Sequence, residues 1–302
     1  MFFVIGGTGF VGKTIVRKLL EAGKSVQVLY RGEPDHPFVR DLRLTWIRGE
    51  IRSVESLCRG MEGAEAVIHL AGRLVEPGDD TFEKVHVDGT RNILEAAQRS
   101  GVRRLLYMSA LGAGPASASR YHRTKWQAEE AVCASPLNAT IFRPSLIFGR
   151  EDVSFNLLAK VISYSPLVPV LGRGQNRLQP VWVEDVADCF IRSLDETASC
   201  GKRYSLCGPR SYTFNELTDL ILQIKKATRL KLHIPIALLK GLSFLAEQLF
   251  PRPPLTRDQL KMLQEDNVCR DNQAGKELKV RFKGLEEVLP LYMNGPSFRE
   301  NL

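Results

Sequence analysis

The sequence lacks three features: it has no C-x-x-C pair, no long uncharged apolar run and no low-complexity segment. The missing apolar run argues against a membrane-spanning helix. The six cysteines are far apart and the five histidines do not stand beside them at metal-ligand spacing, so we expect no metal site and predict free thiols in a reducing cytoplasm. These cysteines are Cys58, Cys133, Cys189, Cys200, Cys207 and Cys269.

Charge and composition place the chain among ordinary globular proteins. Apolar residues make up 44% and charged residues 25% of the 302 positions, and the net charge is +8. The basic residues are scattered, which argues against nucleic acid as a partner and suits attraction of an anionic cofactor or an acidic surface. The first expected strand begins at residue 1 and leaves no room for a targeting segment, so for a chain that starts there we expect a cytoplasmic, bacterial protein.

The first twenty residues read as a strand, a glycine turn and a helix. An apolar run at 1–5 precedes the turn GGTGFVG at 6–12, and apolar residues then recur at helical spacing. Gly6 allows the tight turn, Gly9 lets backbone N–H groups approach a pyrophosphate, and Gly12 lets the helix pack closely on the strand. The residues predicted to contact the cofactor here are Gly6, Thr8, Gly9, Phe10, Val11 and Gly12.

A second motif overlaps the first. Gly7, Gly12, Lys13 and Thr14 satisfy the phosphate-loop pattern G-x-x-x-x-G-K-T, which is typical of nucleoside triphosphatases. The dinucleotide turn is favoured, because bulky apolar side chains occupy the middle of the loop and no later apolar strand ends in an aspartate for Mg²⁺.

Arg31 follows the second expected strand, residues 25–30. In a dinucleotide-binding fold an acidic side chain at this point binds the ribose 2′-hydroxyl of NAD, whereas an arginine accepts the 2′-phosphate of NADP. We therefore expect NADP(H) rather than NAD(H), with a solvated loop charge as the alternative. Further cofactor contacts are predicted where the strands expected at 44–50 and 64–72 end, at Glu50, Ile51, Leu70, Ala71 and Gly72.

Alternating strands and helices predict the fold class: α/β, with a Rossmann doubly wound parallel sheet and a smaller helix-rich C-terminal lobe. We expect an NADP(H)-binding domain over 1–150 and a mainly substrate or lid lobe over 151–302, with 178–195 returning to the sheet. The apolar segment 236–250 is expected to be a core or lid helix. An interfacial membrane helix and a partner-binding helix are its alternatives.

Tyr121 and Lys125 are four residues apart in a helical segment that follows the fifth expected strand, so both face the ligand end of the sheet. A nearby lysine ammonium and a nicotinium charge would lower the phenol pKa. Tyr121 could then exchange a proton with a substrate hydroxyl or carbonyl while hydride moves to or from the cofactor.

These motifs together resemble the extended and atypical short-chain dehydrogenase/reductase family. The shared features are the turn at 6–12, the Tyr121 and Lys125 pair, Arg-Pro-Ser at 143–145 and QPVWVEDVA at 179–187. Within the family the chain is most similar to the branch of the dehydrogenase-like accessory subunit of respiratory complex I and its bacterial relatives. SALGA at 109–113, YHRTK at 121–125 and LTRDQLKML at 255–263 carry that similarity.

The resemblance implies site residues and leaves three functions open. It implies Ser109 as a third catalytic residue and Pro144 and Ser145 as cofactor contacts. The family's second serine and its active-site asparagine are replaced by Ala110 and His86. The readings are an oxidoreductase acting on a carbonyl or alcohol, a non-catalytic NADPH-binding accessory or assembly protein of a respiratory or membrane complex, and a nucleotide-sugar epimerase or dehydratase. An apolar substrate is compatible with the C-terminal lobe, and peripheral membrane or complex association with its apolar helix.

Overall fold

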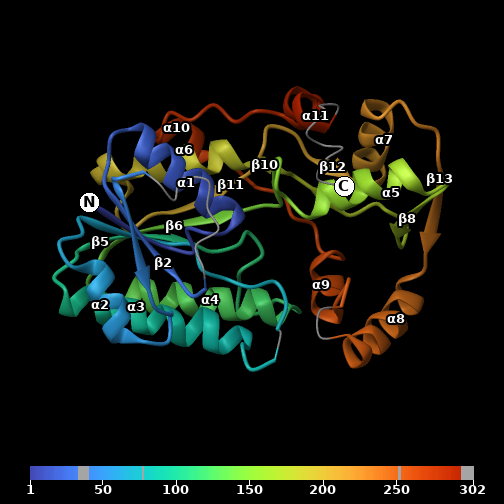
Figure 1. The fold of residues 1–302 in the computed structure, drawn as a ribbon. Helices are drawn as coiled ribbons and strands as arrows, with labels where there is room; N and C mark the ends of the chain where they lie inside the picture. The colour runs from blue at the N-terminus through green and yellow to red at the C-terminus, as the bar shows by residue number, and fades with distance from the viewer. Residues whose placement is uncertain (33–40, 77, 251–252, 294–302) are drawn as a thin grey trace. The chain divides into compact units, whose positions relative to one another are not determined.

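The computed structural model describes residues 1–32, 41–76, 78–250 and 253–293 (Figure 1). The chain divides into two compact units. The first comprises Met1–Pro144, Val186–Ser205 and Asn272–Val280, and the second comprises Ser145–Asp185, Leu206–Asp271 and Arg281–Leu302.

The first unit is built on a seven-stranded sheet of order β11-β6-β5-β4-β1-β2-β3. The strands from β3 to β6 pair in parallel, and β1 pairs with both β2 and β4. The order therefore reverses beside β1, which is where open α/β sheets bind ligands at the carboxyl ends of their strands. The strands are β1 (Phe2–Ile5), β2 (Val26–Tyr30), β3 (Leu44–Arg48), β4 (Ala66–His69), β5 (Arg104–Met108), β6 (Asn138–Pro144) and β11 (Arg203–Leu206).

Helices cover both faces of this sheet, with α2, α3 and α4 on one side and α1 and α6 on the other (Figure 1). Apolar side chains of α2, α3 and α4 pack with those of the central strands in one core. The helices are α1 (Phe10–Glu21), α2 (Val54–Met61), the π-helix η1 (Glu83–Asp88), α3 (Gly89–Arg99), α4 (Arg120–Ala134), α6 (Val183–Asp195), the 3-10 turn η2 (Thr197–Ser199) and α10 (Gln273–Glu277). The predicted Rossmann fold is confirmed.

The second unit is richer in helices and has its own apolar core, which includes Phe148, Phe155, Leu217 and Leu289. Its only extended pairing among the described residues joins β13 and β8 in parallel. Its elements are β7 (Ile147–Phe148), α5 (Ser154–Tyr164), β8 (Leu167–Leu171), β9 (Arg177–Leu178), β10 (Val181–Trp182), β12 (Tyr212–Thr213), α7 (Phe214–Ile224), β13 (Leu230–Ile234), α8 (Ile236–Leu249), α9 (Arg257–Met262) and α11 (Leu285–Met293).

Two cysteines of the second unit correct the expectation of free thiols. Cys207 and Cys269 form a disulfide across a sequence separation of 62 residues. Gln179 lies beside it, donating a hydrogen bond to the carbonyl of Gly208 at 2.7 Å and accepting one from the N–H of Cys269 at 2.9 Å. The spacing of the cysteines did not indicate this disulfide, because only the fold brings these two distant residues together.

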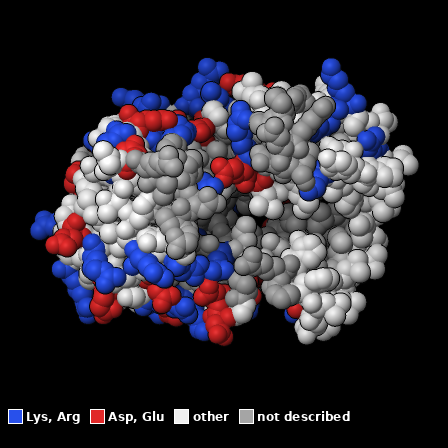
Figure 2. Space-filling view, viewed as in Figure 1, with Lys and Arg blue, Asp and Glu red and all other residues white. Residues whose placement is uncertain are grey.

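The helix α8 is not a core helix. Its single buried residue is Ser243, although most of its side chains are apolar. Leu238, Leu242, Leu245 and Leu249 recur at helical spacing and are between 51% and 73% exposed. Figure 2 shows the corresponding surface, at the lower right, to be largely free of charged side chains. The helix therefore presents an apolar face outward, which marks interaction surfaces rather than ordinary solvent-facing helices. None of the described helices combines the length and the hydropathy needed to cross a bilayer.

Candidate functional site

The glycine turn lies between β1 and α1, at the point where the sheet order reverses. Gly6 has φ of +85°, a conformation that residues with a side chain rarely adopt. A Cβ on Gly6 would also lie 2.9 Å from the backbone nitrogen of Ala71, in the segment that follows β4. Gly6 is thus required by its own backbone conformation and by its close neighbour.

Gly12 and Gly9 differ in what surrounds them. A Cβ on Gly12 would lie 2.1 Å from the carbonyl oxygen of Gly6, so only glycine lets α1 approach the turn this closely. A Cβ on Gly9 would meet only that same oxygen, at 3.4 Å. Gly9 is the N-cap of α1 and no side chain caps its N–H groups. The turn therefore fits an anionic group such as a pyrophosphate, which would accept these N–H groups at the positive end of the helix.

The remaining residues of the predicted turn contribute unequally. Thr8 is exposed, Phe10 is half-buried and Val11 is buried in the packing of α1. The N–H of Lys13 donates to the carbonyl of Gly9 at 2.8 Å, as expected for the first turn of an ordinary helix.

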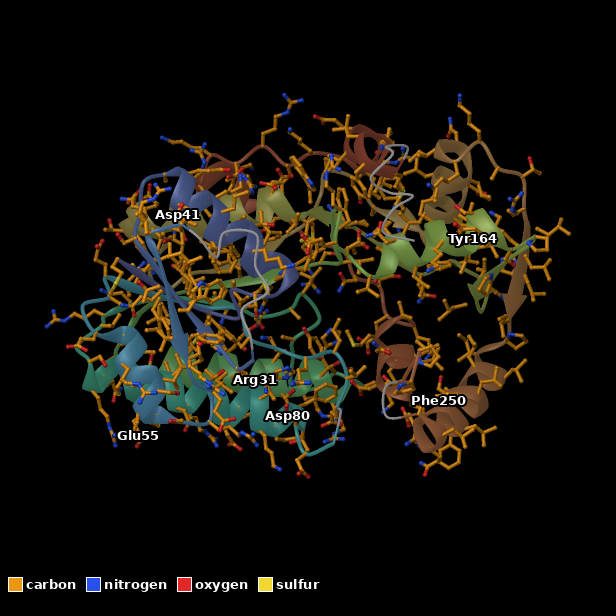
Figure 3. All side chains as sticks on the ribbon, in the orientation of Figure 1. Arg31, Asp41, Glu55, Asp80, Tyr164 and Phe250 are labelled. Atoms are coloured by element: carbon orange, nitrogen blue, oxygen red, sulfur yellow. A yellow bond between two sulfur atoms is a disulfide. The ribbon has the colours of Figure 1, made fainter. Side chains whose placement is uncertain are left out.

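Arg31 leaves the end of β2 with its side chain 55% exposed, and its Nη1 lies 3.3 Å from Oδ2 of Asp80 (Figure 3). Asp80 also pairs with Arg73 at 2.7 Å and with Arg52 at 3.9 Å. Burial alone would raise the pKa of Asp80, but the hydrogen bond from Arg31 and the charges of the arginines outweigh it and lower that pKa. Sequence reasoning found Arg31 and missed Asp80 and the two arginines that share it, Arg52 and Arg73, because Asp80 lies 49 positions from Arg31 in the sequence.

The other predicted cofactor contacts lie at the carboxyl ends of β3 and β4. The carboxylate of Glu50 pairs with Arg52 at 3.1 Å, and the carbonyl of Ile51 accepts a hydrogen bond from Asn92. Leu70 is buried and its N–H donates to Ile5 at 2.8 Å, which continues the pairing of β4 with β1. Ala71 and Gly72 follow it toward the face of α4.

Gly72 connects the cofactor side of the site to Lys125. A Cβ on Gly72 would lie 3.8 Å from Nζ of Lys125 and 3.6 Å from Nε2 of His86. Lys125 is buried, and its Nζ donates to the carbonyl of Met108, the last residue of β5, at 2.6 Å. The Lys125 ammonium also lies 4.6 Å from the centre of the Tyr107 ring.

Tyr121 lies one turn before Lys125 in α4, among aromatic rings. The ring of Tyr121 meets those of Phe82 and His86 edge to face, with centres 5.9 and 5.3 Å apart. Burial raises the pKa of Tyr121 to about 12 and lowers the pKa of Lys125 to about 7, with Glu129 opposing the second shift. In the chain without a cofactor, desolvation therefore outweighs any lowering of the phenol pKa by Lys125. The expected lowering by Lys125 together with a nicotinium charge concerns the cofactor-bound site and stays a prediction.

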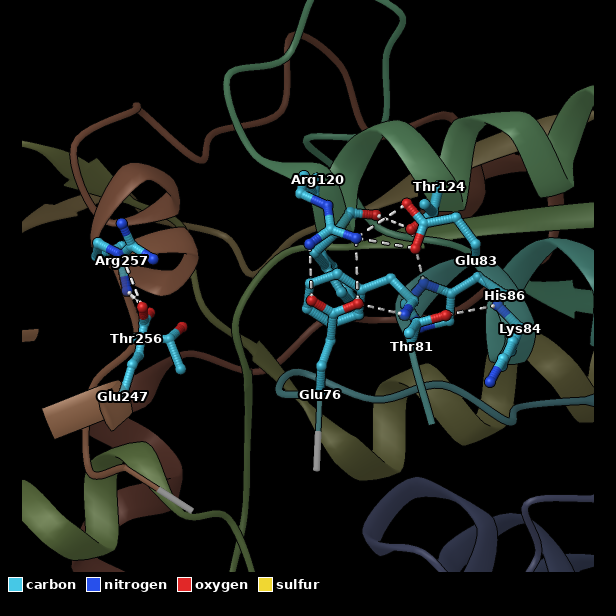
Figure 4. Close-up of polar contacts among 12 residues, drawn as sticks. Glu76, Thr81, Glu83, Lys84, His86, Arg120, Thr124, Glu247, Thr256 and Arg257 are labelled. Carbon is cyan, nitrogen blue, oxygen red and sulfur yellow. Dashed lines mark hydrogen bonds and ion pairs between the residues drawn. The ribbon is translucent and has the colours of Figure 1, made fainter. Parts of the chain in front are cut away.

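The start of α4 is anchored by ion pairs. Arg120, immediately before Tyr121, pairs with Glu76 and Glu83, each at 3.0 Å (Figure 4). Glu76 also accepts the N–H of Phe82 at 2.7 Å. These contacts tie the residues around Tyr121 to η1 and to the segment after β4.

Ser109 is buried directly after β5, and its N–H donates to the carbonyl of Phe142. Its Oγ is buried without a hydrogen-bond partner among the described residues. A buried hydroxyl of this kind is uncommon in folded proteins and is expected to find a partner. Ala110 follows and is also buried, so Ser109 is the hydroxyl that this strand end offers.

His86, where the resemblance implies an asparagine, makes two hydrogen bonds from the π-helix η1. Its Nε2 lies 3.1 Å from the N–H of Arg73 and its Nδ1 lies 2.9 Å from Oγ1 of Thr124. Thr124 donates its own hydroxyl proton to the carbonyl of Tyr121, so Nδ1 carries the hydrogen and Nε2 accepts. Burial, with the charge of Lys125, lowers the pKa of His86 to about 3. His86 is therefore neutral and positions the segment after β4 against α4.

A buried ion pair, also missed from the sequence, continues the face of α4 that carries Tyr121 and Lys125. Glu129 is buried, and Arg143 of β6 binds it at 2.9 Å through Nε. Pro144 ends β6 in the same unit, and its carbonyl accepts the N–H of Leu111. Ser145 belongs to the second unit, where its Oγ donates to Oδ1 of Asn267 at 2.5 Å.

Comparison with known proteins gives a family match and several relatives. The model of the NAD dependent epimerase/dehydratase family matches residues 2–207. Subunit 9 of the NADH dehydrogenase (ubiquinone) 1 alpha subcomplex, mitochondrial, from Arabidopsis thaliana is 32% identical over 286 residues, covering 89% of this chain and 71% of that one. Ceramide reductase of Caulobacter vibrioides is 38% identical over 184 residues, 61% of this chain and 57% of that one.

Solved structures agree on the fold. The dTDP-glucose 4,6-dehydratase DesIV of Streptomyces venezuelae, described with NAD bound, has a TM-score of 0.79 at 21% identity and covers 100% of this chain and 97% of its own. At this identity the likeness supports the fold alone. The predicted resemblance is confirmed by the family match, which also implies a nicotinamide dinucleotide as cofactor. Because that match spans residues 2–207 of a chain of 302, the protein belongs to the NAD dependent epimerase/dehydratase family.

Proposed function

We propose that the chain binds NADP(H) and interconverts a carbonyl and an alcohol. The observation that carries this proposal is the buried hydroxyl of Ser109, which has no partner among the described residues. It lies at the carboxyl end of β5, the strand whose last carbonyl holds Lys125. A substrate oxygen would accept the Ser109 hydroxyl, which would stabilise negative charge that develops on that oxygen.

Tyr121 and Lys125 have complementary protonation states for this chemistry. With its pKa near 12, Tyr121 keeps its proton at neutral pH and donates it from Oη when a carbonyl is reduced. With its pKa near 7, Lys125 exchanges a proton at Nζ under the same conditions. A bound nicotinamide supplies or accepts the hydride.

The turn at 6–12 and the arginines around Asp80 support the choice of cofactor. The uncapped start of α1 suits the pyrophosphate, and Arg31 at the end of β2 suits the 2′-phosphate that distinguishes NADP from NAD. Leu70, Ala71 and Gly72 offer a surface of small and apolar groups for the nicotinamide half.

Replacement of Tyr121 tests the proposed role. Tyr121→Phe should abolish NADPH oxidation and leave the Kd for NADPH within about twofold of wild type, because the ring is retained. Tyr164→Phe, at an exposed tyrosine of the second unit, is the matched control. NADPH oxidation is measured with a panel of carbonyl compounds. The panel includes ceramide-type and sterol-type compounds, because two relatives are named ceramide reductase and sterol demethylase protein B. Turnover that survives Tyr121→Phe would exclude Tyr121 as the proton donor.

A second candidate function is that of a non-catalytic NADPH-binding accessory protein at a membrane. The outward apolar face of α8 favours it, and one relative is a subunit of a respiratory dehydrogenase. The proposed occupant of this face is a bilayer surface, because the exposed side chains of α8 are aliphatic and aromatic.

Vesicle binding tests the membrane contact of α8 on which the second candidate depends. The wild type should co-sediment with phosphatidylglycerol vesicles, and Leu245→Glu should lose that binding, whereas Leu291→Glu, at an exposed leucine of α11, should keep it. Equal binding of both variants would remove α8 from the argument. NADPH that co-purifies with the chain and is not oxidised by any compound of the panel would favour the accessory role over the enzyme.

A further inference from the structure

Three arginines that follow three parallel strands of the sheet converge on Asp80. Arg31 follows β2, Arg52 lies beyond the end of β3, and Arg73 lies beyond the end of β4. Their guanidinium nitrogens lie 3.3, 3.9 and 2.7 Å from the carboxylate of Asp80. Figure 3 shows the labelled pair Arg31 and Asp80 side by side. These strands are parallel and lie within one run of four, β4-β1-β2-β3, so the loops that follow them meet at the same edge of the sheet.

The three arginines pair with two carboxylates. Asp80 lies within ion-pair distance of all three, and Glu50 pairs with Arg52. The charge of Asp79 also acts on Arg52. The side chain of Asp80 is 18% exposed, whereas those of Arg31 and Arg52 are 55% and 47% exposed. The carboxylate is therefore the inner member of the cluster, and Arg31 and Arg52 are the members that a ligand can reach from solvent.

We propose that Asp80 is an internal counterion that occupies the anion position of these arginines and is displaced by the 2′-phosphate of NADP(H). The inference rests on the proposed cofactor and adds a residue that decides between the two dinucleotides. The ribose hydroxyl of NAD(H) has no charge with which to compete for the arginines. A phosphate monoester carries nearly two charges and three acceptor oxygens, and it matches the fork of a guanidinium group better than one carboxylate does.

Displacement has a cost that falls on NADP(H) alone. To bind Arg31, the phosphate must break the ion pair between Arg31 and Asp80. The phosphate and the Asp80 carboxylate then share Arg73 and Arg52. NAD(H) leaves the cluster intact. Neutralising Asp80 should therefore strengthen the binding of NADP(H) and leave that of NAD(H) unchanged.

The test compares Asp80→Asn with Asp79→Asn by titration calorimetry. Asp79 influences Arg52 through its charge alone. Asp79→Asn is the matched control because it removes the same charge one residue away from Asp80. In Asp80→Asn the Kd for NADPH should fall roughly tenfold, the equivalent of one charge-assisted contact, while the Kd for NADH stays constant. Asp79→Asn should change neither value by more than about twofold. Circular dichroism and Tm verify that both variants fold.

Three further probes identify the source of the phosphate. Adenosine 2′,5′-bisphosphate should gain affinity in Asp80→Asn as NADPH does, whereas adenosine 5′-monophosphate and inorganic phosphate should not. A gain shared by inorganic phosphate would mean a general anion site and overturn the inference. So would weaker NADPH binding in Asp80→Asn, since Asp80 would then hold the arginines in place for the cofactor. If the wild type binds neither dinucleotide, the proposed function fails first, which is a distinct result.

Discussion

Replacing Gly12 by alanine should separate the packing role of the glycine turn from its binding role. A Cβ at this position would lie 2.1 Å from the Gly6 oxygen and 2.6 and 2.8 Å from the Cα and carbonyl carbon of Gly7. All three atoms belong to the backbone, so no flexible side chain can move aside. Either α1 shifts away from the turn or the turn opens.

The expected change in the free energy of unfolding of Gly12→Ala follows from two opposing effects. Overpacking against backbone atoms costs about 1–3 kcal/mol, and strain of this degree lies at the upper end. Alanine in a helix is favoured over glycine by about 1 kcal/mol. We therefore expect Gly12→Ala to lower the free energy of unfolding by about 2 kcal/mol, and to weaken dinucleotide binding because the N–H groups of α1 are displaced.

Gly9→Ala is the matched control, since its Cβ would meet only the Gly6 oxygen at 3.4 Å, an ordinary contact. Its free energy of unfolding should stay within about 0.5 kcal/mol of wild type. Its Kd for NADPH should rise, because the methyl group stands where the pyrophosphate approaches.

The assay combines thermal unfolding followed by fluorescence with NADPH titration of wild type and both variants. A Gly12→Ala protein with wild-type Tm would refute the packing argument. A Gly9→Ala protein with wild-type affinity for NADPH would refute the position assigned to the pyrophosphate.

Two other predictions concern buried groups. Folding lowers the pKa of Lys125 from 10.5 to about 7, so the folded chain binds fewer protons than the unfolded chain between these values and stability should rise with pH in that window. Lys125→Met should remove this rise, measured as Tm from pH 7 to 9, and an unchanged slope would place the titration elsewhere. Thiol titration in denaturant should count four thiols before reduction and six after, since Cys58, Cys133, Cys189 and Cys200 lie outside the disulfide. Cys207→Ser should lower the free energy of unfolding by up to about 4 kcal/mol, as the loop closed across 62 residues becomes unrestrained.

The part of the site that the sequence predicted is local. The turn at 6–12 is recognisable because glycines are needed where a strand passes directly into a helix. The positive φ of Gly6 and the approach of Gly12 to the Gly6 oxygen involve only residues of the turn, whereas the contact of Gly6 with Ala71 depends on the fold. Tyr121 and Lys125 are likewise recognisable because four residues make one helical turn. Their protonation states were not predictable, because desolvation depends on everything that packs around α4.

The sequence by itself determined the fold class and the alternation of strands and helices in the first unit, because apolar runs and helical periodicity are local. It did not fix the ends of the strands, since the strand expected at 64–72 ends at His69. Only the tertiary structure decided which side chains meet. Asp80 reaches Arg31 across 49 positions, His86 reaches Thr124 across 38, and Cys207 reaches Cys269 across 62. These contacts depend on strand order and on the directions of loops, which no single stretch encodes. The same topology gathers charges from separate strand ends at one edge of the sheet, where the cofactor is expected to bind.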